Sequence, residues 1–176
     1  DRSEHISHIA LNRLAKDVKK ILKNPLNDNG IYYKHDESDM LKGYALIIGP
    51  EDTPYAHGYY LFELSYPTDY PHSPPVVKFR TNDGNVRFNP NLYRSGKVCV
   101  SILNTWRGEG WSGCQTISSI LLTLCSLLNN EPLLNEPGKT KLDIDYPKYD
   151  KIVTFKNIQM LIKILMKKDD IYVDWF

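Results

Sequence analysis

FNPNLYRSGKVCVSIL, residues 88–103, is the stretch on which the interpretation of the whole chain depends. It lies within Thr81–Trp111, a segment of about thirty residues without helical or strand periodicity, and loops of that length inside a compact domain are often functional. Cys99 stands in the middle of the segment between two valines. Apolar neighbours alone favour a core cysteine, whereas the long loop favours a reactive one. The sequence therefore predicts that the chemistry of the chain lies in this loop.

The residues before the loop predict one helix and a small sheet. Apolar residues recur every three or four positions from Ile6 to Leu22, and Pro25 ends this helix. The next extended runs are joined by connections too short for crossover helices, so they should form an antiparallel meander. The four predicted strands are Ile31–His35, Leu41–Ile48, Tyr59–Ser65 and Val76–Arg80.

The residues after the loop predict further helices. Ser112 and Gln115 match a capping box, which would begin the Leu-rich helix Ile117–Leu128, with Cys114 in its first turn and Cys125 in the core. A last helix, roughly Lys148–Lys167, carries one apolar stripe, which comprises Ile152, Phe155, Ile158 and Leu161 or Ile162. These elements predict an α+β fold, with residues 1–176 as a single domain whose core spans about residues 5–167.

Composition excludes several classes of protein. The 176 residues are 41% hydrophobic and 24% charged, which excludes a disordered chain, and the net charge of +1 argues against a nucleic-acid binder. The apolar runs are far shorter than the ~20 residues that cross a bilayer, and no apolar leader opens the chain. Three cysteines without a CxxC pair predict a reducing compartment, cytoplasm or nucleus. The five histidines are scattered and no nucleotide-binding glycine loop is present, so no metal or cofactor is expected.

The central stretch resembles the active-site segment of ubiquitin-conjugating enzymes. In that family a His-Pro-Asn triplet precedes the catalytic cysteine, with its Asn eight residues before it; here Asn89-Pro90-Asn91 precedes Cys99. Other motifs also fall in the family's order, and the resemblance covers roughly residues 5–165. They are Ala10–Lys16, Gly49-Pro50, Tyr66–Pro71 followed by Pro74-Pro75, and Trp111-Ser112.

Two departures from the usual pattern narrow the resemblance to one branch of the family. Asn89 stands where the family usually has histidine, and the insertion Asn104–Gly110 separates the cysteine from Trp111. Both features, together with Asn135–Gly138, are similar to the Z-type branch of the family and to the conjugating domain of a giant apoptosis inhibitor. The family's histidine is structural in this interpretation, so its replacement does not imply a loss of activity.

The resemblance implies a chemistry. The fold would be the ubiquitin-conjugating one, and Cys99 would carry a ubiquitin-like modifier as a thioester before transfer to a substrate lysine. Asn91 would stabilise the oxyanion or brace the loop, and the two roles are compatible. Glu131 maps onto the family's gate acid, although an ordinary loop carboxylate is an equal interpretation. No cofactor is implied at this site, because the activating enzyme consumes the ATP.

The resemblance also implies partners: ubiquitin or a ubiquitin-like protein, the activating enzyme, ligases and protein substrates, with no nucleic acid, no membrane and a monomeric chain. Arg13 and Lys16 match the helix positions that engage the activating enzyme and ligases, although a solvated basic face is the plainer interpretation. His72, Gly113 and Cys114 match ligase-contact positions in two loops, and His72 argues against promiscuous ligase pairing because an apolar residue is usual there.

Two alternatives to an active conjugating enzyme stay open at this point. One is an inactive variant that only binds ubiquitin or a ligase, against which the intact motif around Cys99 argues. The other is a cysteine hydrolase, which needs a histidine near the thiol. The chain has no histidine after His72, which weakens this second alternative.

Overall fold

The computed structural model describes residues 6–167, 170–173 and 175. The chain begins with helix α1 (His8–Lys23), whose first turn is capped by the Ser7 hydroxyl, which accepts a hydrogen bond from the Ala10 amide at 3.1 Å. Lysines in its last turn complement the negative end of the helix dipole. The predicted N-terminal helix is confirmed.

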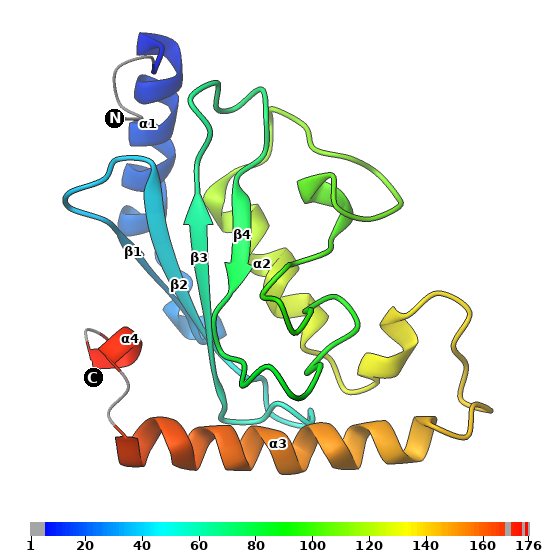
Figure 1. The fold of residues 1–176 in the computed structure, drawn as a ribbon. Coiled ribbons are helices and arrows are strands. Elements are labelled where there is room, and N and C mark those ends of the chain that lie inside the picture. The colour runs from blue at the N-terminus through cyan, green and yellow to red at the C-terminus, as the bar shows by residue number, and fades with distance from the viewer. Residues whose placement is uncertain (1–5, 168–169, 174, 176) are drawn as a thin grey trace.

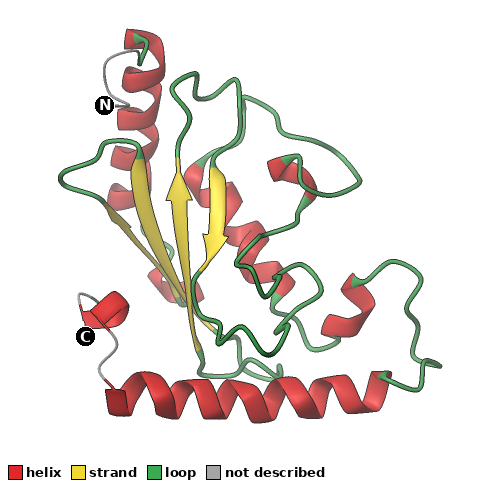
Figure 2. Ribbon diagram, in the orientation of Figure 1, coloured by secondary structure: helices red, strands yellow, loops and turns green. Residues whose placement is uncertain are grey.

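A four-stranded antiparallel sheet follows α1, in the order β1-β2-β3-β4. The strands are β1 (Ile31–His35), β2 (Lys42–Ile48), β3 (Tyr59–Ser65) and β4 (Val76–Phe79). Each strand pairs with its neighbour in sequence, and the register sets Ala45 of β2 opposite Phe62 of β3, both completely buried. Figures 1 and 2 show the strands side by side as a meander, as the short connections predict.

The hydrophobic core lies between the sheet, α1 and helix α2 (Ile117–Leu127). Leu14 and Ile21 of α1 and Ile117, Ile120 and Leu124 of α2 are at most 3% exposed. The long connection between β4 and α2, drawn as a loop in Figure 2, passes along one side of this core. Its only helical segment among the described residues is a 3₁₀ turn, Ser101–Leu103.

Helix α2 begins at Ile117, as predicted, but the predicted capping box is not the one that caps it. Its N-cap is Thr116, which forms a capping box with Ser119, whereas Ser112 and Gln115 lie in the preceding turn. Cys114 is consequently outside the helix and exposed, which corrects its predicted place in the first turn. The reason is that two capping patterns occur one after the other in the sequence, and the N-cap of the second, Thr116, directly precedes buried Ile117.

The predicted last helix is confirmed, whereas the apolar stripe in its sequence is not the face that it buries. Helix α3 (Tyr146–Lys167) lies across one end of the sheet (Figure 1) and buries Val153, Met160 and Ile164. The four stripe residues Ile152, Phe155, Ile158 and Ile162 are instead 51–62% exposed. Helix α4 (Asp170–Val173) follows, and the side chain of Tyr172 is buried. No helix among the described residues combines the length and the apolar character needed to cross a bilayer.

Candidate active site

The segment before Cys99 is a tight hairpin that fixes the position of the cysteine. Leu92 and Val98 face each other across an antiparallel bridge, and the Tyr93 amide donates to the Lys97 carbonyl at 2.9 Å. Gly96 makes the turn with φ of +86°, and a Cβ there would lie 2.8 Å from the Phe79 carbonyl oxygen. The apparently irregular loop is therefore ordered by its own backbone hydrogen bonds and by contact with β4.

Asn91 is bonded to Cys99 twice. The Cys99 amide donates to the Asn91 carbonyl at 2.8 Å, and the Asn91 side-chain amide Nδ2 donates to the Cys99 carbonyl at 2.7 Å. The Oδ1 atom of Asn91 is buried and has no hydrogen-bond partner among the described residues. The loop-bracing contact predicted as one role of Asn91 is thus present, and a second N–H of the same amide group is left for another acceptor.

Asn89, which replaces the family's usual histidine, is a completely buried hydrogen-bonding centre. Its Nδ2 donates to the Leu127 carbonyl at 2.7 Å and to the Tyr55 hydroxyl at 2.9 Å, while its Oδ1 accepts from the Asn91 amide at 2.9 Å. One side chain thereby joins the active-site loop to the end of α2. These contacts support the structural interpretation of this position.

Tyr93 lies at the site, and no role was predicted for it from the sequence. Its hydroxyl interacts with the Cys99 thiol, and burial, followed by this interaction, raises the pKa of Tyr93. The guanidinium of Arg87 lies over the Tyr93 ring at 4.2 Å from the ring centre, and Arg87 also pairs with Glu136 at 3.5 Å. The only sequence signal was its place in the motif, because the turn that brings Tyr93 beside Cys99 is set by Gly96.

Cys99 itself is a free thiol with 2% of its surface exposed. The position is consistent with both interpretations of the sequence, since the residue is packed like a core cysteine yet stands in the loop. Cys125, the predicted core cysteine, is half-buried within α2, and burial raises the pKa of its thiol. The surroundings of the three cysteines therefore differ, and Cys99 alone has the asparagine and tyrosine beside it.

Glu131, the candidate gate acid, is held by two neighbours. Its carboxylate forms an ion pair with Lys141 and accepts a hydrogen bond from the Tyr146 hydroxyl at 2.5 Å. The Lys141 contact first, and then that of Tyr146, lowers the pKa of Glu131. The carboxylate is thereby a weaker base than an unpaired glutamate, and its described contacts tie it to Lys141 before α3 and to the first residue of α3.

The insertion after Cys99 is anchored at both ends. The Thr105 hydroxyl donates to the Val98 carbonyl at 3.0 Å and accepts from the Val100 amide at 2.9 Å, which braces the cysteine from its other side. The Trp111 amide donates to the Asn104 side chain, and the Trp111 indole donates to the Pro71 carbonyl, each at 2.8 Å. The tryptophan therefore joins the active-site loop to the loop after β3.

Arg13 is more deeply engaged than a surface residue. Its Nε pairs with the buried Asp17 at 3.0 Å, and its two terminal nitrogens donate to the Gly113 and Gln115 carbonyls, each at 2.8 Å. The Tyr70 hydroxyl also donates to Asp17, at 2.7 Å. The expectation that Arg13 lies on a freely exposed face is wrong, because its guanidinium joins α1 to the segment before α2.

The predicted partner residues nevertheless lie on connected elements. Arg13 binds the Gly113 carbonyl, and a Cβ on Gly113 would lie 3.6 Å from the Pro71 carbonyl, next to His72. Lys16, His72, Gly113 and Cys114 are exposed. The structure thus brings together one face of α1 and the two loops that carry His72, Gly113 and Cys114. Partner contacts were predicted separately for each of these segments.

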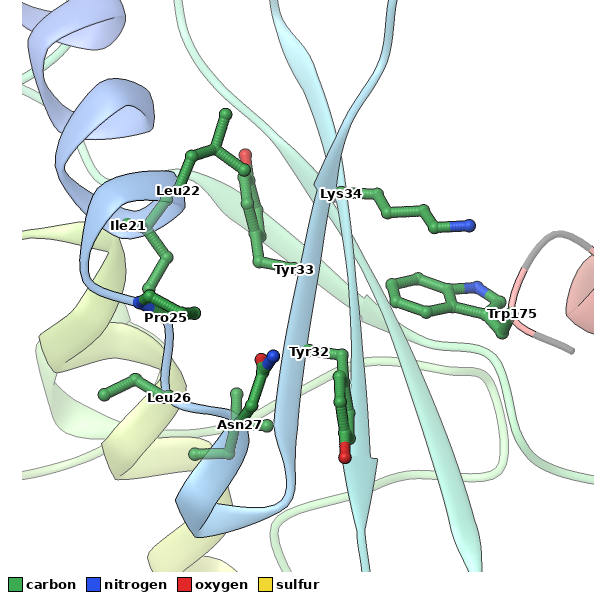
Figure 3. Close-up of a pocket in the computed structure, with 10 residues that line it drawn as sticks. Ile21, Leu22, Pro25, Leu26, Asn27, Tyr32, Tyr33, Lys34 and Trp175 are labelled. Carbon is green, nitrogen blue, oxygen red and sulfur yellow. The ribbon is translucent and has the colours of Figure 1, made fainter.

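A cavity of 420 Å³ lies away from the thiol. Figure 3 shows it between the end of α1 with the residues after it and strand β1, with Trp175 facing Lys34 on the other side of the strand. The Lys34 ammonium stands 4.8 Å from the Trp175 ring centre. Residues 88–105 contribute nothing to the described lining, so this cavity is separate from the reaction site.

Comparison with known proteins connects this geometry to a family. The family model described as ubiquitin-conjugating enzyme matches residues 13–158. Ubiquitin-conjugating enzyme E2 Z of Xenopus tropicalis is 42% identical over 163 residues, which are 91% of this chain and 51% of the frog protein. The human dual E2 ubiquitin-conjugating enzyme/E3 ubiquitin-protein ligase BIRC6 is 47% identical over 137 residues, 72% of this chain and 3% of that protein.

A solved structure supports the same assignment. Human ubiquitin-conjugating enzyme E2 G1 matches with a TM-score of 0.58 and 32% identity over 68% of this chain and 93% of that one. The chain spans about half the length of the E2 Z relative. The order of helix, meander, active-site loop and helices, the triplet before Cys99 and these matches agree: the chain belongs to the ubiquitin-conjugating enzyme family, and its resemblance to the Z-type branch is confirmed.

Proposed function

We propose that the chain accepts ubiquitin or a ubiquitin-like modifier from an activating enzyme on Cys99 and passes it to a substrate lysine, usually with a ligase. The observation that carries the proposal is the fixed position of Cys99: Asn91 is hydrogen-bonded to both the backbone amide and the backbone carbonyl of Cys99, and the Tyr93 hydroxyl interacts with its thiol. The family and its relatives support this activity.

The reaction comprises two acyl transfers. The Cys99 thiolate attacks the thioester carbonyl on the activating enzyme, a new carbon–sulfur bond forms, and the enzyme's cysteine leaves as a thiolate. A lysine amine then attacks the Cys99 thioester, an amide bond forms, and Cys99 is released as a thiolate while the amine loses a proton. Exchange between thioesters is nearly isoenergetic, so neither step needs a metal or nucleotide at this site.

In the second step an oxyanion forms on the thioester carbonyl, and the loop must stabilise this negative charge. The second N–H of the Asn91 amide is the donor we assign to it, since the first holds the Cys99 carbonyl. One such donor is typically worth ~2.7–4 kcal/mol of barrier. The lysine starts near a pKa of about 10.4 and must lose its proton before or during attack. Glu131, paired with Lys141, is a weak candidate for the base that accepts this proton.

Partner docking is assigned to the surface that joins Lys16, His72, Gly113 and Cys114. Arg13 contributes to it by holding the Gly113 segment against α1, which makes Arg13 a positioning residue. The groups bonded to Cys99 are an asparagine and a tyrosine rather than a histidine, so the cysteine hydrolase alternative gains no support.

Incubation with activating enzyme, ATP and ubiquitin tests the proposal. A non-reducing gel is expected to show an adduct that forms only with ATP, that disappears on reduction and that decays when free lysine is added. An adduct that forms but resists lysine would support the binding-only alternative. Absence of any adduct with ubiquitin and with a panel of ubiquitin-like modifiers, each with its own activating enzyme, would contradict the proposal.

A further inference from the structure

Helix α3 exposes an apolar face on the side that is turned away from the domain. Figure 1 shows α3 at the outer boundary of the molecule, with the other described elements on one side of it. Val153, Met160 and Ile164 are buried. Six other apolar residues of the helix are between 51% and 80% exposed, namely Ile152, Phe155, Ile158, Ile162, Leu165 and Met166. A contiguous apolar surface of this kind on a soluble domain marks an interaction site.

The spacing of these residues is that of a helix-packing seam. Intervals of three, four and three residues, the a/d pattern of a coiled coil, run through Phe155, Ile158, Ile162 and Leu165. Seven residues before the first two of these positions stand two lysines, so they occupy the same lines of the helix. The seam is therefore one lysine layer and two apolar layers over about 26 Å of helix. The α3 seam comprises Lys148, Lys151, Phe155, Ile158, Ile162 and Leu165.

The lysine layer of the seam lacks a carboxylate partner. Lys148 and Lys151 are both exposed, and neither forms an ion pair within the part of the chain that the structure describes. Lys163 is exposed as well. The one acidic residue of α3 is Asp150, which has a buried carboxylate oxygen. The outer face of α3 is therefore both apolar and cationic.

These features favour an acidic helix over other occupants. The a/d residues of one helix fit the holes of another, and carboxylates complement the lysine layer. A second copy of the chain offers Lys148 and Lys151 no carboxylate from its own α3 except Asp150. A membrane would have to accept two ammonium groups in line with the apolar residues, whereas interfacial helices carry their lysines on the polar face.

We propose that the α3 seam binds an amphipathic helix of a partner protein, in which a layer of Asp or Glu precedes or follows the apolar a and d residues. This docking surface goes beyond the proposed function, because no residue of the seam is among those bonded to the active-site loop. The contact of α3 with that loop is made by Tyr149, whose hydroxyl donates to the Arg87 carbonyl at 3.2 Å.

Fluorescence anisotropy with designed helical peptides tests the proposal. Each peptide has leucines in two a/d layers and two glutamates in a third, at the N-terminal end in one version and at the C-terminal end in another. Matched controls carry lysines in place of the glutamates. We expect one Glu peptide to bind about 10-fold more tightly than its Lys control at low salt, and the ratio to fall as salt screens the charges. Equal affinities of both Glu peptides and their controls, or no binding of either Glu peptide, would overturn the proposal.

Two double variants assign the binding to the seam. Lys148→Glu plus Lys151→Glu should reverse the preference, so that the Lys peptide binds more tightly. Phe155→Ser plus Ile162→Ser should abolish binding. The control Ile9→Ser plus Leu22→Ser, which removes two exposed apolar side chains from α1, should keep the wild-type affinity. A preference for Glu peptides that survives the lysine reversal would overturn the proposal.

The other occupants are tested on the same chain. Co-sedimentation with phosphatidylcholine–phosphatidylserine vesicles reports membrane binding, and light scattering of the chain alone reports self-association. Vesicle binding or a dimer that is lost in Phe155→Ser plus Ile162→Ser, without binding of the Glu peptides, would overturn the proposal. Failure of the wild type to accept ubiquitin or a related modifier would contradict only the proposed function, since peptide binding does not depend on Cys99.

Discussion

Asn91 carries two roles that a single substitution can separate. Asn91→Ala removes the hydrogen bond to the Cys99 carbonyl and the donor assigned to the oxyanion. We expect discharge to free lysine to slow by about 10²-fold, the usual cost of one oxyanion donor, and charging by the activating enzyme to fall much less. Single-turnover rates of the two steps measure the difference. Equal losses in both steps would leave loop bracing as the only role.

Asn89 offers a prediction about stability. Asn89→Ala leaves the Asn91 amide without its buried partner, whereas the Leu127 carbonyl keeps the hydrogen bond from Asn135; an unsatisfied buried group costs about 1–3 kcal/mol. The free energy of unfolding, measured by urea denaturation, should fall by at least that amount. Asn130→Ala, at an exposed asparagine beyond the end of α2, is the matched control and should change it by less than about 0.5 kcal/mol. Similar unfolding free energies for both variants would contradict a structural role of Asn89.

At the scale of the elements, the junction between α1 and the segment before α2 depends on Arg13. Arg13→Ala leaves Asp17, with a side chain only 6% exposed, without its cation and frees two backbone carbonyls. Hydrogen bonds to charged groups are worth about 1.5–3 kcal/mol, so the unfolding free energy should fall by about that amount. The control Lys16→Ala, on the same helix and exposed, should leave it nearly unchanged. An unaltered melting temperature for Arg13→Ala would contradict this account of the junction.

Lys16 gives the complementary prediction on partner binding. An exposed charge contributes little to folding, but across an interface it acts mainly on the rate of encounter, and salt weakens that action. Lys16→Glu should therefore slow charging by the activating enzyme at low ionic strength, less so at high, with the melting temperature unchanged. A salt series of initial charging rates measures this. Charging at the wild-type rate in low salt would identify this part of α1 as an ordinary solvated surface.

At the scale of the whole molecule, local patterns predicted most of the architecture. The strands Ile31–His35 and Tyr59–Ser65 end where alternation and turn residues indicate, and the connections determined the meander. Cys99 and Asn91 were identified by resemblance to the family's active-site segment, and the spacing of that motif can be recognised because the hairpin between them is built from sequence neighbours. Such features depend on contacts within a few residues, which a sequence displays directly.

The features that the sequence did not predict depend on distant contacts. Arg13 meets Gly113 across one hundred residues, so its charge alone indicated a surface role. The apolar stripe of α3 is exposed because the helix packs against the sheet through Val153, Met160 and Ile164 instead. Periodicity alone cannot predict which face is buried when both faces of a helix are apolar. Tyr93 is the local exception: it lies in the same hairpin as Cys99, but the turn at Gly96 that brings its hydroxyl to the thiol is visible only in the folded chain.

The central claim is that Cys99 alone carries the acyl group, and an intact-mass measurement after charging tests it most directly. The Cys114→Ser plus Cys125→Ser variant should gain one ubiquitin that reducing agent removes. Cys99→Ser should form an oxyester that survives reduction and is cleaved by alkali, because a hydroxyl replaces the thiol. Cys99→Ala should gain no mass. A reducible ubiquitin adduct that persists in Cys99→Ala would contradict the account.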